Sequence, residues 1–134
     1  DAEKNLVYNH KDILIVGFVS DVYKYLSIVD LLIFPSKKEG LPIVVTESLA
    51  MGVPVISFNS RGTNELITND FNGVLISNGM NKQEEINSFV KNITILLQDD
   101  LKFNTIKSNT VLNREQLSRT NFITNEINMY YNLI

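Results

Sequence analysis

The sequence predicts an α/β domain in which helices cover both faces of a parallel sheet, followed by a helical C-terminal tail. Two observations carry this prediction. Four short apolar runs alternate with segments of helical periodicity, and unbroken apolar runs are typical of parallel strands that are buried on both faces. After residue 80 the apolar residues recur only at helical spacing. A chain of 134 residues is enough for one domain, which we take as residues 1–134.

The first predicted elements are a strand and a helix. The run DILIVGFV, residues 12–19, predicts a strand that ends in a glycine-containing turn, and residues 1–11 are expected to be a flexible N-terminal stretch. In residues 21–29 the apolar positions follow an i, i+3, i+4, i+7 pattern, which predicts a helix with Ser20 or Asp21 as its N-cap. DLLIFP, residues 30–35, then predicts a second strand that Pro35 closes.

The segment PIVVTESLAMG, residues 42–52, is ambiguous on local grounds. Its β-branched residues favour a strand, whereas ESLAMG favours a helix with Gly52 after its end. Pro42 favours the helix, because proline is preferred at the first helical position. Two further strands are predicted in PVISF (residues 54–58) and GVLIS (residues 73–77), with a helical turn between them that opens at Thr63 or Asn64.

The tail, residues 80–134, predicts three helices. The first runs from Lys82 to Leu97, the second from Asp99 to Asn113 and the third from Arg114 to Ile134. The apolar stripe of the first helix is expected to be its packing face; it consists of Ile86, Phe89, Val90, Ile93 and Leu97.

Composition excludes several classes of function. The net charge of −3 argues against nucleic-acid binding, since no basic excess is present to follow phosphates. The chain has no cysteine and a single histidine, His10, so disulfides and thiolate or histidine metal clusters are excluded, and no metal is expected. No apolar run approaches the roughly 20 residues that span a bilayer.

Two acids interrupt an otherwise apolar segment, and they suggest a ligand. Glu39 lies in a Gly-Pro turn, and Glu47 lies eight positions later on the predicted helix. The first amides of that helix, those of Ile43 and Val44, have no intrahelical acceptor and favour an anion. Carboxylates accept hydrogen bonds from sugar hydroxyls, so acids on either side of an anion site predict a ligand with hydroxyls flanking a phosphate, such as a nucleotide-sugar.

The stretch FPSKKEGLPIVVTESLAMGVPVISFNSRGTNELITNDFNGVLI resembles the C-terminal, donor-binding domain of GT-B glycosyltransferases of the retaining group 1, or family 4, class. The acid-x7-acid spacing from Glu39 to Glu47 is that family's signature. ILIVGFVSDVYKYLSIVDLLIFPS looks like the segment that precedes it. The resemblance implies a partial Rossmann-like sheet, truncated at its N-terminal side, that lacks the acceptor domain and the basic pair that contacts the pyrophosphate.

The resemblance also implies residue roles. Glu39, the catalytic candidate, would bind the donor hexose and position its anomeric carbon, and Glu47 would bind the ribose hydroxyls. The other donor-binding candidates line the sugar and phosphate (Gly40, Leu41, Pro42 and Ile43), lie under the nucleoside (Val44) or border the base (Gly17, Phe18 and Val19).

The implied activity is transfer of a hexose from a UDP- or GDP-linked donor to a glycan or lipid-linked acceptor in cell-surface polysaccharide synthesis. The donor is a substrate, and no cofactor is expected. The full-length protein would be cytoplasmic, peripheral at the inner face of the membrane, whereas this chain alone would be inactive and would self-associate through its incomplete sheet.

Two alternatives remain open, a nucleotide-sugar epimerase of the same fold and a non-catalytic α/β interaction module such as a receiver. An epimerase would be expected to place a histidine in the donor site, for which His10 is badly placed. A receiver would need an acidic cluster after its first strand, where this chain reads VGFVS.

Overall fold

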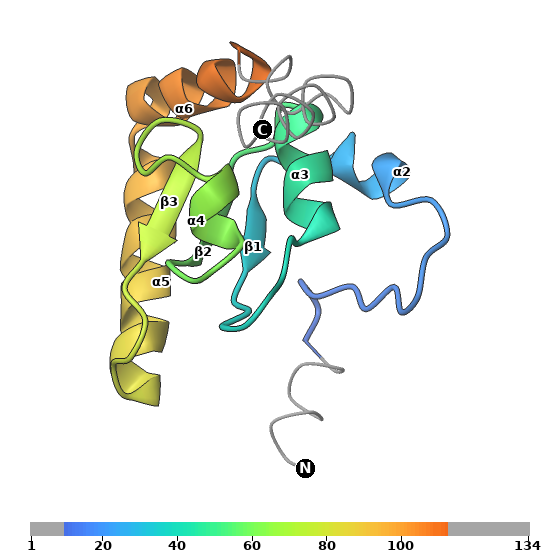
Figure 1. Ribbon diagram of the computed structural model, residues 1–134. Coiled ribbons are helices and arrows are strands. Elements are labelled where there is room, and N and C mark those ends of the chain that lie inside the picture. The colour runs from blue at the N-terminus through green and yellow to red at the C-terminus, as the bar shows by residue number, and fades with distance from the viewer. Residues whose placement is uncertain (1–9, 113–134) are drawn as a thin grey trace, which may run out of the picture.

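The computed structural model describes residues 10–112, which form one α/β unit (Figure 1). Its elements in chain order are α2 (Tyr23–Leu26), β1 (Leu32–Phe34), α3 (Ile43–Ala50), β2 (Val55–Phe58), α4 (Thr63–Leu66), β3 (Gly73–Ile76), α5 (Lys82–Gln98) and α6 (Asp100–Leu112). Strands and helices alternate as far as α5. This order confirms the predicted fold class.

The three strands form one parallel sheet in the order β1-β2-β3. Ile56 in the central strand is opposite Ile33 of β1 and Val74 of β3. Every residue of β2 is buried, as expected for a parallel strand covered on both sides. The strands predicted at 30–35, 54–58 and 73–77 are therefore confirmed, although each is shorter than its apolar run.

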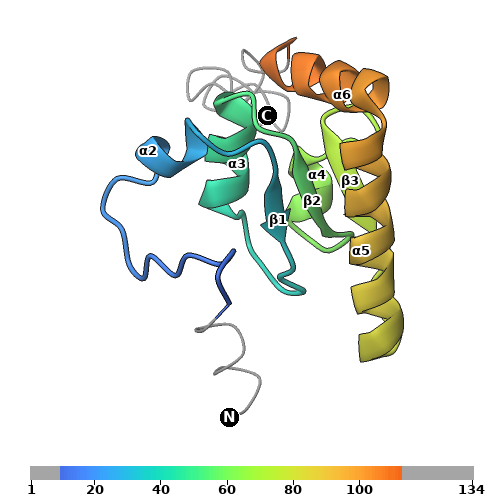
Figure 2. The ribbon, with the colours of Figure 1, turned by 180° about the vertical axis from the view of Figure 1, so that it is seen from behind.

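Helices cover both faces of the sheet, as predicted (Figures 1 and 2). Because side chains alternate along a strand, β2 contributes to two separate cores. Val55 packs with Val45 and Leu49 of α3, while Ile56 packs with Phe89 and Leu96 of α5. The sheet is thus fixed between α3 and α4 on one face and α5 and α6 on the other.

The strand predicted at residues 12–19 is wrong. Residues 13–16 form neither strand nor helix, and their exposed fractions lie between 43% and 83%. Within residues 10–112, β1 pairs only with β2, so the apolar run at residues 12–19 has no strand partner.

The helix predicted at 21–29 is present but shorter, because α2 is a single turn. It begins after Val22, whose side chain makes no capping hydrogen bond. The predicted N-cap is also wrong, since Asp21 pairs with Lys24 instead, with 3.5 Å between Oδ2 and Nζ.

Helix α3 settles the ambiguous segment. Pro42 occupies the N-cap with φ −74° and ψ 105°, one position earlier than predicted, and the helix begins at Ile43. Its end fits the prediction, because Gly52 has φ +79°, which suits glycine. The Val53 amide also donates to the Ser48 carbonyl at 2.9 Å, which closes the turn.

The first two helices of the predicted tail are confirmed as α5 and α6, and α5 opens with a capping box formed by Asn81 and Glu84. Its buried face differs from the prediction, because Glu85, Phe89 and Leu96 are the buried residues. The predicted stripe faces partly outward, with Val90 57% exposed. Ile86 and Val90 line an open groove together with Ile33 of β1.

The third predicted helix and most of residues 1–11 lie outside the described residues. Within residues 10–112, no helix has both the length and the apolar character that crossing a bilayer requires.

Candidate functional site

Two loops at the carboxyl edge of the sheet form the candidate site. One joins β1 to α3 and the other joins β2 to α4, and both lie at the lower edge of the sheet in Figure 1. Ligands of open α/β sheets bind at this edge. A pocket of about 340 Å³ lies there, lined by Glu39, Gly40, Leu41, Arg61 and Glu65.

A close backbone contact holds the two loops together. Gly62 has φ +86°, and a Cβ atom at this position would lie 1.9 Å from the carbonyl oxygen of Gly40. The second loop is itself fixed by Thr63, whose hydroxyl donates to the Phe58 carbonyl at 2.6 Å. The Ser60 amide in turn donates to the Thr63 hydroxyl at 3.2 Å. These contacts set the distance between the walls of the pocket.

Glu39, the catalytic candidate, is half-buried in the first loop and held by a neighbour. The Ser36 hydroxyl donates to Glu39 Oε1 at 2.5 Å. This bond restricts the carboxylate to one orientation and leaves Oε2 as an acceptor for a ligand hydroxyl. Gly40 and Leu41 continue the same wall of the pocket.

The N-terminus of α3 follows directly. No side chain caps it, and the Pro42 carbonyl accepts from the amides of Val45 and Thr46 at 3.1 and 3.3 Å. Among residues 10–112, the amides of Ile43 and Val44 donate to no protein acceptor. Unpaired amides at a helix N-terminus are suited to an anion, and an anion site beside Glu39 stays a prediction.

Glu47 lies one turn further along α3 and contacts α2. The pKa of the Tyr23 hydroxyl is raised above its ordinary value, mainly because Tyr23 donates a hydrogen bond to Glu47, and also because the nearby Glu47 charge opposes formation of a phenolate. Burial and Asp21 add smaller effects. Tyr23 and Glu47 therefore interact between α2 and α3.

The other predicted donor-binding residues do not all lie at the Glu39 pocket. Val44 is half-buried and packs against the α3 core, and Ile43 is 70% exposed. Gly17 and Phe18 are exposed, Phe18 to 98%, and Val19 is half-buried, but none of the three lines the Glu39 pocket. The structure thus groups Glu39, Gly40 and Leu41 but leaves the segment expected at the base apart.

Four residues at this edge were not predicted as site residues, namely Ser36, Arg61, Glu65 and Tyr23. Arg61 is exposed, but it lines the pocket with Glu39. The parallel pairing of β1 with β2 brings the two loops together. In the sequence, the only sign that Arg61 belongs to the site is its place in the turn that follows the predicted strand PVISF. Tyr23 has no comparable local signal. Within the described part of the chain, no three acidic or histidine side chains are close enough to hold a metal ion.

Comparison with known proteins identifies the family. The model of the family described as "Glycosyl transferases group 1" matches residues 3–111. The chain belongs to the group 1 glycosyltransferases. This group 1 chain is 32% identical over 99 residues to the UDP-Gal:alpha-D-GlcNAc-diphosphoundecaprenol alpha-1,3-galactosyltransferase of Escherichia coli, covering 74% of the chain and 24% of the relative.

A second relative is the N,N'-diacetylbacillosaminyl-diphospho-undecaprenol alpha-1,3-N-acetylgalactosaminyltransferase of Campylobacter jejuni. It is 30% identical over 94 residues, which are 69% of this group 1 chain and 24% of the relative. The chain therefore spans about a quarter of the length of these curated relatives.

Solved structures show the same fold. Anabaena HepE in complex with UDP and glucose has a TM-score of 0.78 at 21% identity, over 98% of this group 1 chain and 35% of HepE. The C-terminal domain of LpcC from Francisella tularensis, a group 1 protein, has a TM-score of 0.67 at 22% identity, over 90% of this chain and 60% of that one. The described unit thus has the Rossmann-like fold of the C-terminal half of a GT-B protein.

Proposed function

We propose that this chain is the donor-binding part of a retaining glycosyltransferase that moves a hexose from a UDP- or GDP-linked sugar to a glycan or lipid-linked acceptor. One observation carries the proposal. Glu39 faces a pocket that is followed at once by the uncapped N-terminus of α3, and Glu47 lies one turn beyond. An acid, an anion site and a second acid, in that order, match hexose, diphosphate and ribose.

Each part has a chemical role. Glu39 accepts hydrogen bonds from the hexose hydroxyls, and the Ser36 hydroxyl keeps its carboxylate aimed at them. The amides of Ile43 and Val44 donate hydrogen bonds that stabilise the negative charge developing on the departing diphosphate. Arg61 adds a positive charge at the same pocket. In this proposal the protein's own groups, rather than a metal ion, stabilise the negative charge of the diphosphate.

The acceptor and the location belong to the same proposal. The names of the Escherichia coli and Campylobacter jejuni relatives specify an acceptor sugar that is linked to diphosphoundecaprenol, which is a lipid. HepE was solved with UDP-glucose bound. These names support a bacterial enzyme that acts on a lipid-linked acceptor, and the same proposal places it at the cytoplasmic face of the membrane. Because the chain spans about a quarter of its curated relatives, we expect it to transfer no sugar by itself.

Two isosteric variants test the assignment of the acids. Glu47→Gln should weaken binding of UDP and of UDP-glucose alike, by about 1–3 kcal/mol, since it removes charge-assisted bonds to the ribose. Glu39→Gln should weaken only UDP-glucose, because bare UDP has no hexose for Glu39 to bind. GDP and GDP-mannose test the other base in the same way.

Isothermal titration of the chain with each ligand gives the comparison. Asp30→Asn is the matched control, since Asp30 pairs with Lys107 at 3.6 Å, away from the pocket, and this variant should bind as the wild type does. Equal loss of UDP binding in Glu39→Gln and Glu47→Gln, or no effect of either, would contradict the proposal.

A further inference from the structure

A buried carboxylate on α5 is unexplained by packing alone. Glu85 is 5% exposed and occupies the buried face of α5 together with Phe89 and Leu96, where an apolar residue would be expected. A buried charge is unfavourable unless it is paired. Its partner is Lys37, whose Nζ lies 2.7 Å from Oε1 and 2.6 Å from Oε2 of Glu85.

Lys37 belongs to the loop that carries Glu39. It stands one residue after Ser36, which donates to Glu39, and two residues before Glu39 itself. Its ammonium also lies 5.2 Å from the centroid of the Phe58 ring at the end of β2. The Phe58 ring in turn meets Phe89 edge to face, with 5.0 Å between centroids. Lys37 is therefore held by both α5 and β2.

The ion pair does not face the Glu39 pocket. Lys37 and Glu85 line a separate apolar groove of about 460 Å³, together with Ile33, Ile86 and Val90. That groove lies on the α5 face of the sheet, whereas Glu39 precedes α3 on the opposite face. Lys37 is thus placed to act on the ligand only through the loop.

We propose that the Lys37–Glu85 ion pair is a positioning element that fixes the loop of residues 36–41, so that Glu39 meets the donor hexose. The inference rests on the proposed function of Glu39. An apolar pair could fill the same space. The contact of one ammonium with both carboxylate oxygens is directional, so it fixes the position of the loop in a way that an apolar contact does not. Lys37 and Glu85 are positioning residues and contact no substrate.

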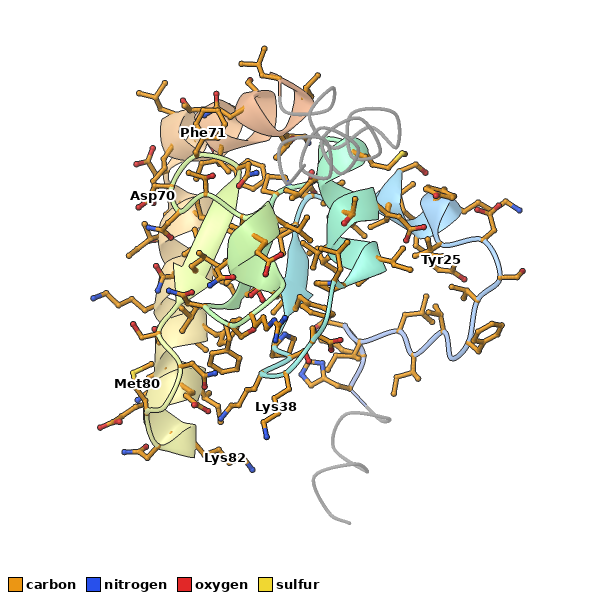
Figure 3. All side chains as sticks on the ribbon, viewed as in Figure 1. Tyr25, Lys38, Asp70, Phe71, Met80 and Lys82 are labelled. Carbon is orange, nitrogen blue, oxygen red and sulfur yellow. The ribbon has the colours of Figure 1, made fainter. Side chains whose placement is uncertain are left out.

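Replacement of the pair separates positioning from stability. Lys37→Met removes the ammonium, keeps the apolar stem and leaves Glu85 buried without its partner. Lys37→Met/Glu85→Met removes both charges, and such apolar replacements of buried pairs often restore stability. Lys37→Arg keeps the charge as the conservative variant. The control is Lys102→Met, which breaks the 2.7 Å pair with Asp70 at the opposite edge of the sheet from Lys38 (Figure 3).

The first readout is the ratio of UDP-glucose affinity to UDP affinity, measured by titration calorimetry. It should fall by about tenfold in Lys37→Met, since a displaced Glu39 loses a charge-assisted hydrogen bond to the hexose while the bonds to UDP remain. The ratio should stay low in the double methionine variant even though its melting temperature recovers. Lys37→Arg should restore the ratio, and Lys102→Met should leave it unchanged. Recovery of the ratio in the double variant would overturn the proposal.

The second readout needs no ligand. The order parameters of the amide N–H vectors of Lys38, Glu39 and Gly40, from nitrogen-15 relaxation, should be lower in Lys37→Met and in the double variant than in the wild type or Lys102→Met. Unchanged order parameters there would overturn the positioning role by itself. If the wild type binds UDP-glucose no better than UDP, but the loop amides of Lys37→Met are still less ordered, the proposed function of Glu39 is refuted and the positioning of the loop by the Lys37–Glu85 pair is supported.

Discussion

The contact between Gly62 and Gly40 makes a sharp prediction about both stability and the site. Gly62→Ala places a methyl group 1.9 Å from the Gly40 carbonyl oxygen, whereas ordinary van der Waals contact begins near 3.4 Å. The two loops must separate by about 1.5 Å, which widens the pocket that Glu39 lines. The change acts at the proposed hexose position without touching an acidic group.

The magnitude follows from two costs. A non-glycine residue at φ +86° carries strain of about 1–3 kcal/mol, and forced overpacking adds about 1–3 kcal/mol. The free energy of unfolding should therefore fall by about 2–6 kcal/mol. Gly79→Ala is the matched control, because Gly79 has φ +96° but nothing within 4 Å of the added Cβ. It should show the strain cost alone.

Urea unfolding followed by circular dichroism measures both variants, and amide chemical shifts of residues 39–42 report on the loop. Gly62→Ala should be clearly less stable than Gly79→Ala and should shift those amides, while Gly79→Ala should not. If the two variants lose the same free energy and the loop amides of Gly62→Ala stay in place, the two loops are not in contact and the pocket is wrongly assembled.

Three further predictions concern other parts of the chain. The Tyr23–Glu47 interaction is present below the ordinary tyrosine pKa and is lost as pH rises through the raised one, so Glu47→Gln should let Tyr23 ionise at lower pH in an ultraviolet alkaline titration, with Tyr23→Phe identifying its absorbance; a Tyr23 titration that Glu47→Gln leaves unchanged refutes the interaction. Gly73→Ala places a Cβ 2.4 Å from the Val55 carbonyl and should destabilise the β2–β3 pairing by about 1–3 kcal/mol in urea; a free energy of unfolding equal to that of the wild type would contradict this contact. Because the outer edge of β1 is unpaired among residues 10–112, the mass from light scattering should rise with concentration; a constant monomer mass contradicts this.

The sequence predicts the central fold well because its signals are local. The runs that become β1, β2 and β3 are apolar throughout, as is typical of parallel strands, and β2 is buried at every position. Pro42 correctly indicates that the segment after it is a helix rather than a strand. Asn81 and Glu84 form the capping box that starts α5. In each case the residues that decide the structure are neighbours in the chain.

The errors share the opposite cause. Residues 12–19 have the same apolar character as β1, but a strand needs a partner, and pairing is a property of distant segments. Lys37 and Glu85 are 48 residues apart, so the charge at the buried face of α5 has no local explanation. Arg61 joins Glu39 only because β1 and β2 are adjacent. Sequence periodicity therefore predicts helices and strands. The site depends on contacts between residues that are far apart in the sequence, and periodicity gives no information on these contacts.

The most direct test of the central claim is an amide chemical-shift map of the isotopically labelled chain titrated with UDP-glucose. The account predicts that the largest changes fall on residues 39–44 and 61–63, the two loops at the carboxyl edge and the first turn of α3. Changes confined to the groove that Ile86 and Val90 line, or no changes up to saturating ligand, would contradict the assignment of the donor site.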